Sequence, residues 1–231
     1  ARWFDEDWNA QFDTQPWADT LNFYLEMMNE SGPNGAANNG FNENLTLFQQ
    51  GKCGMWIDAT VAASFVTGAD STVADKVGFA LAPDNGLGPR GNWLWAWSLA
   101  IPTSSEKQDA AKAFVSWATS KGYTELVAAN EGWANVPPGT RTSLYENQEY
   151  LDAAPFAAMT LQSINSADPT NPTVDPVPYT GVQFVAIPEF AGFATQVGQQ
   201  FSDALAGNQT AEQALENAQE LTVEEMEAAG Y

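Results

Sequence analysis

The stretch that decides the fold is Phe41-Asn42-Glu43-Asn44-Leu45-Thr46-Leu47-Phe48-Gln49-Gln50-Gly51-Lys52-Cys53-Gly54-Met55-Trp56-Ile57-Asp58. Its first ten residues place three large apolar side chains on one helical face, and Gly51 ends the predicted helix. Residues 53–57 are typical of a strand, and Asp58 follows that strand directly. A carboxylate at the end of a strand, beside a helix N-terminus, lies where α/β sheets place ligands, although a helix N-cap explains the same residue equally well.

The pattern on both sides of this stretch alternates helices with strands. We expect strands at residues 53–57, 76–81 and 98–101. Capping-box spacing predicts that one helix begins at Ser105 and another at Thr210. The other helices are expected at residues 16–28, 41–50 and 61–65, over a stretch ending near Asn130, and at residues 187–205. This alternation favours an α/β fold.

Tryptophan is the most informative component of the composition. The chain has nine tryptophans, no histidine and one cysteine, and three of the tryptophans lie in Gly91-Asn92-Trp93-Leu94-Trp95-Ala96-Trp97. Flat rings offer apolar faces to the C–H face of a sugar or polyol, while carboxylates and amides bind its hydroxyls. About half of the tryptophans are expected to serve ordinary packing. The absence of histidine and of paired cysteines favours binding over catalysis, without metal or cofactor.

The charge of the chain is strongly negative, at −21 with 29 acidic and eight basic residues. Nucleic acid is therefore an improbable partner, because its binding needs clustered cations, and anionic membrane surfaces are disfavoured for the same reason. The lone Cys53 excludes an internal disulfide. No apolar run approaches the length of a membrane span, and no signal peptide opens the sequence.

Several short motifs, in order along the chain, resemble those of the extracellular solute-binding proteins of ABC importers, family 1. The first is the stretch from Phe41 to Asp58. It is followed by Ala80-Leu81-Ala82-Pro83, Leu99-Ala100-Ile101-Pro102, Asp109-Ala110-Ala111-Lys112-Ala113-Phe114 and Leu205-Ala206-Gly207-Asn208-Gln209-Thr210-Ala211-Glu212-Gln213-Ala214-Leu215. Two further strings, Trp56-Ile57-Asp58-Ala59-Thr60 and Trp133-Ala134-Asn135-Val136-Pro137-Pro138-Gly139-Thr140-Arg141, resemble the subgroup that binds mannitol and sorbitol.

The resemblance implies a type II periplasmic binding protein with two lobes that close around a sugar alcohol and deliver it to a membrane permease. The family is about twice as long, so the chain resembles a C-terminal fragment. Residues 1–88 and 144–231 would then form the C-terminal lobe, and residues 89–143 would cross into the N-terminal lobe. Without its parent sheet, the strand near Trp97 to Ile101 exposes an edge, and we expect self-association or a half-site. The implied location is periplasmic, and the missing half would explain why no signal peptide is seen.

The family resemblance places ligand contacts on loops at strand ends. Carried over residue by residue, it selects Asp58, Thr60, Asn92, Trp93, Trp95, Trp133, Asn135, Arg141, Tyr179 and Gln183. The acid and the amides would bind vicinal hydroxyls, the arginine would give a forked donor pair, and the rings would form stacking walls. Each of these residues also has an ordinary explanation in packing or loop capping. Glu43, Asp175 and Glu189 are weaker candidates, because acidic residues also mark helix starts.

Two other classes of function remain open at this stage. A glycosidase also combines tryptophans with two carboxylates, and Asp58 with Glu131 or Glu189 is a conceivable pair, but no spacing singles one out. A lectin-like module or adhesin would use the same rings without a transporter. Among polyols and sugars, the sequence does not choose between mannitol, sorbitol, arabitol and xylitol, which differ in hydroxyl configuration or by one carbon.

Overall fold

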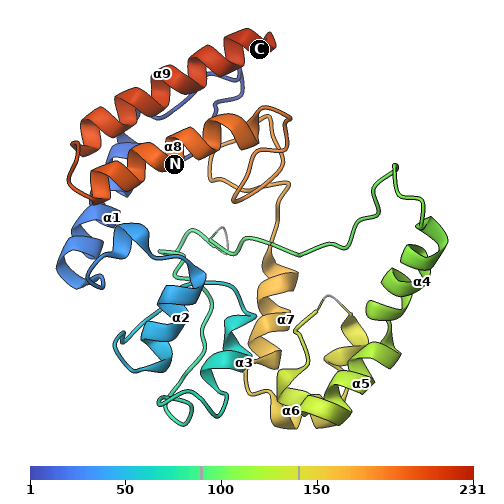
Figure 1. Ribbon diagram of the computed structural model, residues 1–231. Helices are drawn as coiled ribbons and strands as arrows, with labels where there is room; N and C mark the ends of the chain where they lie inside the picture. Colours follow the sequence, from blue (N-terminus) through green and yellow to red (C-terminus); the bar gives the residue numbers. More distant parts are fainter. Residues whose placement is uncertain (89–90, 140) are drawn as a thin grey trace. The chain divides into compact units, whose positions relative to one another are not determined.

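The computed structural model describes residues 1–88, 91–139 and 141–231, and the regular structure in them is helical (Figure 1). Contacts divide the chain into two compact units. Unit 1 comprises Ala1–Gly40, Pro83–Trp93 and Ala167–Tyr231. Unit 2 comprises Phe41–Ala82 and Leu94–Ser166.

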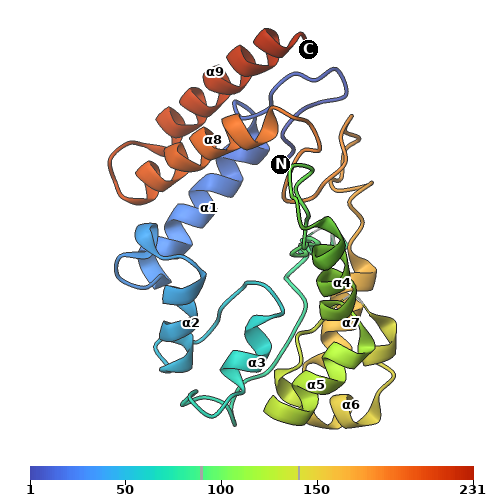
Figure 2. The ribbon, with the colours of Figure 1, turned by 45° about the vertical axis from the view of Figure 1, so that its right-hand side comes forward.

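Unit 1 contains a hairpin of two long helices, α8 (Phe190–Leu205) and α9 (Ala211–Ala229). They run antiparallel and lie side by side in both views (Figures 1 and 2). The helix α1 (Gln15–Ser31) packs against both of them, and the short helix η1 (Ala36–Asn38) also contacts α8. The three long helices bury a shared core.

Local sequence explains where the unit 1 helices begin and end. The N-terminus of α9 carries the predicted capping box, since the Gln213 N–H donates to Thr210 Oγ1 at 3.1 Å and the Thr210 N–H donates to Gln213 Oε1 at 3.1 Å. Gly207 closes the preceding turn at a φ of 78°, a conformation that favours glycine. The predicted helix over residues 16–28 is confirmed as α1, with Pro16 in its first turn.

The N-terminal segment completes this core with aromatic side chains. Phe4, Phe12 and Phe193 are each fully buried. Trp3 packs edge-to-face against Phe12, with ring centroids 5.4 Å apart. Gln219 of α9 fixes the segment further, because its Oε1 accepts from the Phe12 N–H at 2.9 Å and its Nε2 donates to the carbonyl of residue 10 at 3.1 Å. Unit 1 thus joins the two ends of the chain in one core.

Unit 2 is built from short helices. They are α2 (Phe41–Gln49), α3 (Ala62–Val66), α4 (Gln108–Ala118), α5 (Lys121–Glu131), η2 (Trp133–Asn135), η3 (Thr142–Leu144), α6 (Gln148–Ala153) and α7 (Ala157–Ser166). Its core is smaller and centres on Val136, Tyr150 and Phe156, each at most 1% exposed. The predicted helices at residues 41–50 and 61–65, and the one ending near Asn130, are confirmed as α2, α3 and α5.

The three predicted strands are not formed in the residues that the structure describes. No sheet contains residues 53–57, 76–81 or 98–101. Among the described residues, the one isolated β-bridge joins Phe4 to Ala10. A strand is stable only when a neighbour satisfies its backbone N–H and C=O groups, and residue pattern alone cannot supply that neighbour. The α/β alternation expected from the sequence is therefore seen here only in its helices.

Two predicted helix starts were also wrong. Helix α4 begins at Gln108 and its N-cap is Lys107, while Ser105 Oγ accepts the Lys107 N–H at 3.2 Å in the turn before it. Helix α8 begins at Phe190 rather than at residue 187, because Pro188 and the N-cap Glu189 precede it. The hydroxyl of Ser105 caps a turn and not the helix, so the capping-box spacing misplaced the start.

The tryptophans divide as expected between packing and exposure. Trp3, Trp8 and Trp17 pack against the unit 1 core and Trp133 packs against the unit 2 core. Those with large exposed fractions are Trp93, Trp95, Trp97 and Trp117. The two compact units divide the chain at other positions than the predicted lobes, which refer to a longer protein and stay a prediction. Among the described residues, no helix is both long and apolar enough to span a membrane.

Candidate functional site

Asp58 and Thr60 lie in the exposed segment that leads into α3 in unit 2. Asp58 Oδ1 accepts the N–H of Ala59 at 2.6 Å, and the Thr60 carbonyl accepts the N–H of Ala63 at 3.1 Å. The carboxylate therefore lies ahead of α3 without capping it, because the N-cap of α3 is Val61, so the N-cap interpretation of Asp58 was wrong. Within the described residues, its second oxygen accepts no hydrogen bond and faces solvent on an exposed residue.

Trp133 and Asn135 form the short helix η2, which packs against α3, α5 and α6. Trp133 rests on the unit 2 core, whereas Asn135 is exposed and donates from Nδ2 to the Glu131 carbonyl at 2.6 Å. The contact between α3 and η2 brings the Asp58 segment and the Trp133 segment into one part of unit 2. These two predicted groups are the clearest pair that the fold brings together.

Arg141 is anchored to the end of another helix. Its Nη2 donates to the carbonyl of Thr119, the C-cap of α4, at 2.6 Å. A cation at a helix C-terminus also stabilises the negative end of the helix dipole. This contact leaves only part of the guanidinium fork for a ligand.

Tyr145, which sequence reasoning missed, holds the loop before Arg141. Its hydroxyl donates to the Gly139 carbonyl at 2.8 Å, and burial raises the pKa of that hydroxyl. The hydroxyl thus remains a neutral donor at physiological pH. A tyrosine six residues from a glycine gives no recognisable motif, so only the fold reveals this contact.

The tryptophan-rich segment is exposed. Trp95 of unit 2 is 59% exposed and meets Trp97 edge-to-face, with ring centroids 5.8 Å apart. Trp93 of unit 1 is 46% exposed, whereas the adjacent Asn92 is buried. The rings therefore present apolar faces to their surroundings, which stacking on a polyol requires.

Tyr179 and Gln183 lie in the irregular part of unit 1 before α8. Tyr179 is buried, and its hydroxyl oxygen accepts the backbone N–H of Trp3 at 3.1 Å. Its ring lies edge-to-face with the ring of Phe4. Burial raises the pKa of its hydroxyl, against a smaller lowering from the Trp3 N–H. Tyr179 thus serves the core of unit 1, and Gln183 is half-buried.

The weaker acidic candidates have local structural roles. Glu43 lies in the first turn of α2, and Glu189 is the N-cap of α8 with a buried carboxylate oxygen. The Asp175 carbonyl accepts the Thr173 hydroxyl at 2.6 Å in an exposed turn. Among the described positions, no group of three acidic or cysteine side chains is placed to hold a metal ion.

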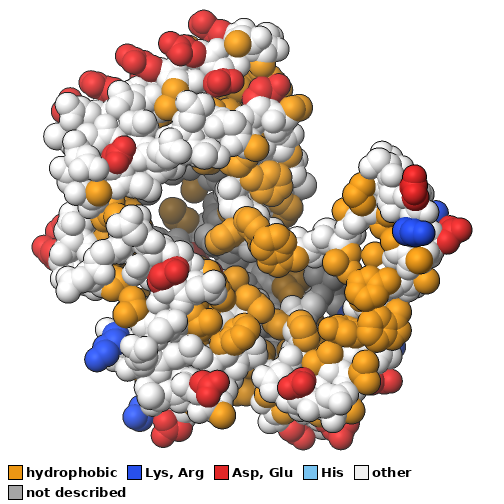
Figure 3. Space-filling model, viewed as in Figure 1, with side chains coloured by type: hydrophobic (Ala, Val, Ile, Leu, Met, Phe, Trp, Pro, Cys, Tyr) orange, Lys and Arg blue, Asp and Glu red, His pale blue; other side chains and the backbone are white. Residues whose placement is uncertain are grey.

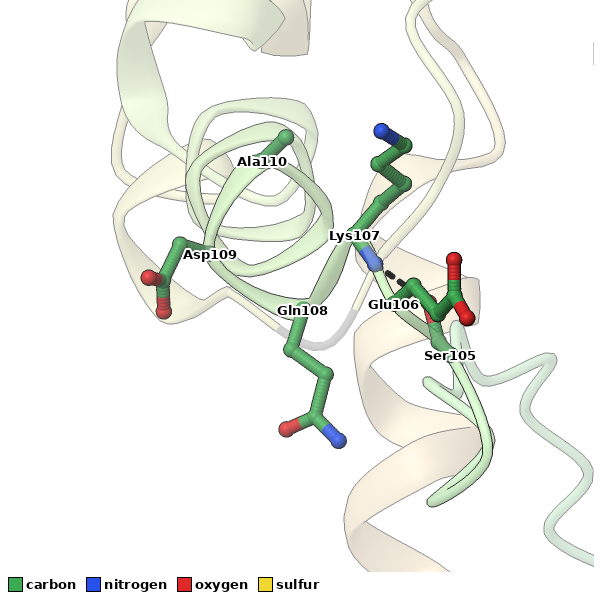
Figure 4. A pocket seen from close by; sticks show the side chains of 6 residues that line it. All are labelled: Ser105, Glu106, Lys107, Gln108, Asp109 and Ala110. Atoms are coloured by element: carbon green, nitrogen blue, oxygen red, sulfur yellow. Dashed lines mark hydrogen bonds between the residues drawn. The ribbon is translucent and has the colours of Figure 1, made fainter.

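Two surface hollows among the described residues contain none of the predicted site residues. One hollow, at the start of α4, is lined by Ser105–Ala110 only, and its side chains point away from one another (Figure 4). The other is a groove between the first turns of α1 and α9, lined by Phe12, Asp13, Thr14, Gln15, Ala18, Asn22, Thr210, Ala211, Glu212, Leu215 and Glu216. Neither hollow gathers the aromatic and amide groups that would bind a polyol.

Comparison with known proteins covers the entire chain. The chain is 54% identical, over its full length, to the mannitol-binding protein of Pseudomonas aeruginosa, and it spans 53% of that relative. It matches the crystal structure of an ABC transporter solute binding protein from Agrobacterium vitis S4 with bound D-mannitol, at 69% identity and a TM-score of 0.98. That match covers all of this chain and 56% of the other. The chain thus spans about half the length of the relatives it matches.

A more distant solved structure shares the fold. Maltose-bound MalE3 of T. maritima matches at a TM-score of 0.73 and 21% identity, over 96% of this chain and 54% of the other. The family model described as bacterial extracellular solute-binding protein matches residues 1–125, which is more than half of the chain. The chain therefore belongs to the family of bacterial extracellular solute-binding proteins.

Proposed function

We propose that this chain is part of the substrate-binding component of an ABC importer that captures a sugar alcohol, with D-mannitol as the favoured ligand. The observation that carries the proposal is the 69% identity, without a break in coverage of this chain, to a solute-binding protein crystallised with D-mannitol. The 54% identity to a mannitol-binding protein supports the same ligand. Delivery to a membrane permease follows from the ABC transporter named in that structure.

The chemistry of the predicted residues fits a polyhydroxylated ligand that is bound and released without chemical change. Exposed indole rings at Trp93 and Trp95 offer apolar faces, and the carboxylate of Asp58 is an acceptor for hydroxyl groups. Asn135 keeps its amide oxygen as an acceptor, because its hydrogen bond to the Glu131 carbonyl uses Nδ2. Tyr179 and Arg141 belong to the proposed set as residues that hold their neighbours in position. The set is completed by Thr60, Asn92, Trp133 and Gln183.

The finer architecture belongs to the same proposal. In the complete protein, residues 1–88 and 144–231 would form the C-terminal lobe of an α/β binding protein, and residues 89–143 would cross into the N-terminal lobe. The TM-score of 0.73 to a maltose-bound protein supports this class of fold. The family description supports a location outside the cytoplasm, and we propose the periplasm.

The alternatives raised by the composition gain no support. Both close relatives carry the names of binding proteins, and neither name describes a glycosidase or a lectin. The chain therefore belongs with binding proteins rather than enzymes. Asp58 needs no carboxylate partner for this role, because it binds hydroxyls and transfers no proton.

A chimera tests the proposal under conditions in which a complete site exists. This chain replaces the matching segment of the Agrobacterium vitis protein, and thermal unfolding is followed with mannitol, sorbitol, arabitol and xylitol. We expect D-mannitol to raise Tm by several degrees at saturation, which binding to the native state alone produces. A folded chimera whose Tm no polyol raises would refute the proposal.

Two variants of the chimera assign the role of Asp58. Asp58→Asn keeps the size of the side chain but removes the charge, so mannitol affinity should fall about ten-fold or more, as for a hydrogen bond to a charged group. Asp70→Asn is the matched control, because Asp70 is also an exposed aspartate of unit 2. Equal affinities of the two variants would remove Asp58 from the site.

A further inference from the structure

The Trp133–Gly139 segment of unit 2 joins the short helix η2 to an irregular loop and carries two of the proposed ligand residues. Two adjacent residues of the loop, Pro137 and Pro138, lack the backbone N–H that would close a turn. Among the described residues, one hydrogen bond holds the backbone from Pro137 to Gly139, and the Gly139 carbonyl accepts it from the Tyr145 hydroxyl at 2.8 Å. This loop therefore depends on a side chain for its position.

Both flanks of the loop are fixed independently of Tyr145. On one side, Val136 is 1% exposed and belongs to the unit 2 core. On the other side, Arg141 Nη2 donates to the Thr119 carbonyl at 2.6 Å. The bond from the Tyr145 hydroxyl is thus the contact that fixes the middle of the loop between these two anchors.

Tyr145 can hold the loop because its own ring is fixed in the interior of unit 2. Hydrophobic side chains at the surface gather over the α4 and α5 region (Figure 3), whereas Tyr145 is only 7% exposed. Its ring packs edge-to-face on that of Tyr150, with centroids 5.9 Å apart, and its N–H donates to the Thr142 carbonyl at 3.0 Å. A hydrogen bond from a donor that packing already immobilises costs little further side-chain entropy.

We propose that Tyr145 is a positioning residue of the ligand site, whose hydroxyl holds the Trp133–Gly139 segment in its binding conformation before the ligand arrives. The inference rests on the proposed function, in which Trp133 and Asn135 contact the polyol. A segment that is already ordered loses less conformational entropy on binding, so the affinity is higher. Without the hydroxyl, fewer molecules have the segment in place, and the apparent affinity falls by the same factor.

Backbone ¹⁵N relaxation of the 231-residue chain without ligand tests the positioning step by itself. The Gly139 amide should have an order parameter near about 0.85, typical of rigid backbone, and Tyr145→Phe should lower it below about 0.6. Tyr150→Phe is the matched control, because that buried hydroxyl has no hydrogen-bond partner among the described residues, and Gly139 should stay rigid in this variant. Helical circular dichroism should be unchanged in both variants.

Isothermal titration of D-mannitol into the chimera measures the consequence for binding. Tyr145→Phe should raise Kd about two- to ten-fold, the effect of losing one hydrogen bond, and Tyr150→Phe should leave Kd unchanged. A Gly139 amide that stays rigid in Tyr145→Phe, or that Tyr150→Phe loosens as much, would overturn the positioning role. Equal Kd values for the two variants of a chimera that binds mannitol would refute this inference alone, whereas a parent chimera that binds no polyol would refute the proposed function and this inference with it.

Discussion

Units 1 and 2 belong to one chain but differ in how completely they bury their apolar side chains. Unit 1 encloses a dense aromatic core, in which Phe4, Phe12 and Phe193 are fully buried. Unit 2 leaves large apolar side chains exposed at Met55, Ile57, Phe65, Trp95, Trp97, Leu99, Phe114, Trp117 and Leu126. The comparison shows that the long helices of unit 1 bury a shared aromatic core, whereas the strand-like parts of unit 2 leave most of their large apolar side chains exposed.

The largest expected loss of stability comes from a substitution that opens a cavity in the core of unit 1. Phe193→Ala should lower the free energy of unfolding by about 3–5 kcal/mol, because the ring is fully buried among other rings. Phe114→Ala in unit 2 should cost less than about 1 kcal/mol, because that ring is 56% exposed. Urea titration followed by circular dichroism measures both, and similar losses would contradict the contrast.

Alkaline pH should weaken unit 2 more than unit 1. Burial raises the pKa of Tyr145 and Tyr150 in unit 2, and the proximity of Tyr145 raises the pKa of Tyr150 further. Burial also raises the pKa of Tyr179 in unit 1, but the hydrogen bond from the Trp3 backbone N–H and the charge of Arg2 partly offset that rise. A tyrosine whose pKa is raised in the folded state stabilises that state below pH 10, and this stabilisation is lost as the pH rises above 10. The loss is about 1 kcal/mol per pH unit for each buried tyrosine.

Hydrogen exchange between pH 9 and 11, corrected for intrinsic rates, separates the two units. The amides of α6 and α7 should lose protection before those of α8 and α9. Loss of protection in the opposite order would show that the tyrosines of unit 2 do not control its alkaline stability.

Removing two buried tyrosine hydroxyls should have opposite effects. Tyr179→Phe leaves the Trp3 N–H without its acceptor and should cost about 1–2 kcal/mol. Tyr150→Phe should be neutral or stabilising by up to about 1 kcal/mol, because the Tyr150 hydroxyl is buried without a hydrogen-bond partner among the described residues. Differential denaturation of the two variants checks the signs, and equal destabilisation would show that Tyr150 has an acceptor.

A helix cap gives the smallest expected effect. Thr210→Ala removes the side-chain half of the capping box of α9 and should cost about 1 kcal/mol. Thr46→Ala is a control of the same kind in the helix interior of unit 2, where the hydroxyl donates to the Asn42 carbonyl on an exposed face and should cost little. A larger loss for Thr46 than for Thr210 would mean that α9 does not depend on its cap.

Local chemistry made part of the fold predictable from sequence. The capping box at Thr210 and the apolar periodicity of α2 act within a few residues, so both were recognised correctly. The strands at residues 53–57, 76–81 and 98–101 depend on distant partners, and no local pattern shows whether a partner is present. The small helices α6 and α7 were not predicted, because each is stabilised mainly by the core it covers.

The candidate site was predictable only in outline. Asp58 and the Trp133 segment lie in one part of unit 2, because α3 packs against η2. Tyr179 was predicted as a ligand contact, but its hydroxyl oxygen accepts the backbone N–H of Trp3. Arg141 was predicted likewise, and its Nη2 donates to the Thr119 carbonyl. Both outcomes depend on contacts between residues distant in sequence, which residue types do not reveal.

Isothermal titration of D-mannitol into the chimera that carries this chain tests the central claim most directly. We predict saturable binding with one site per molecule, and an affinity at least about ten-fold weaker when Asp58 is changed to asparagine. A correctly folded chimera that gives no heat of binding with D-mannitol would contradict the assignment of this chain to a polyol-binding protein.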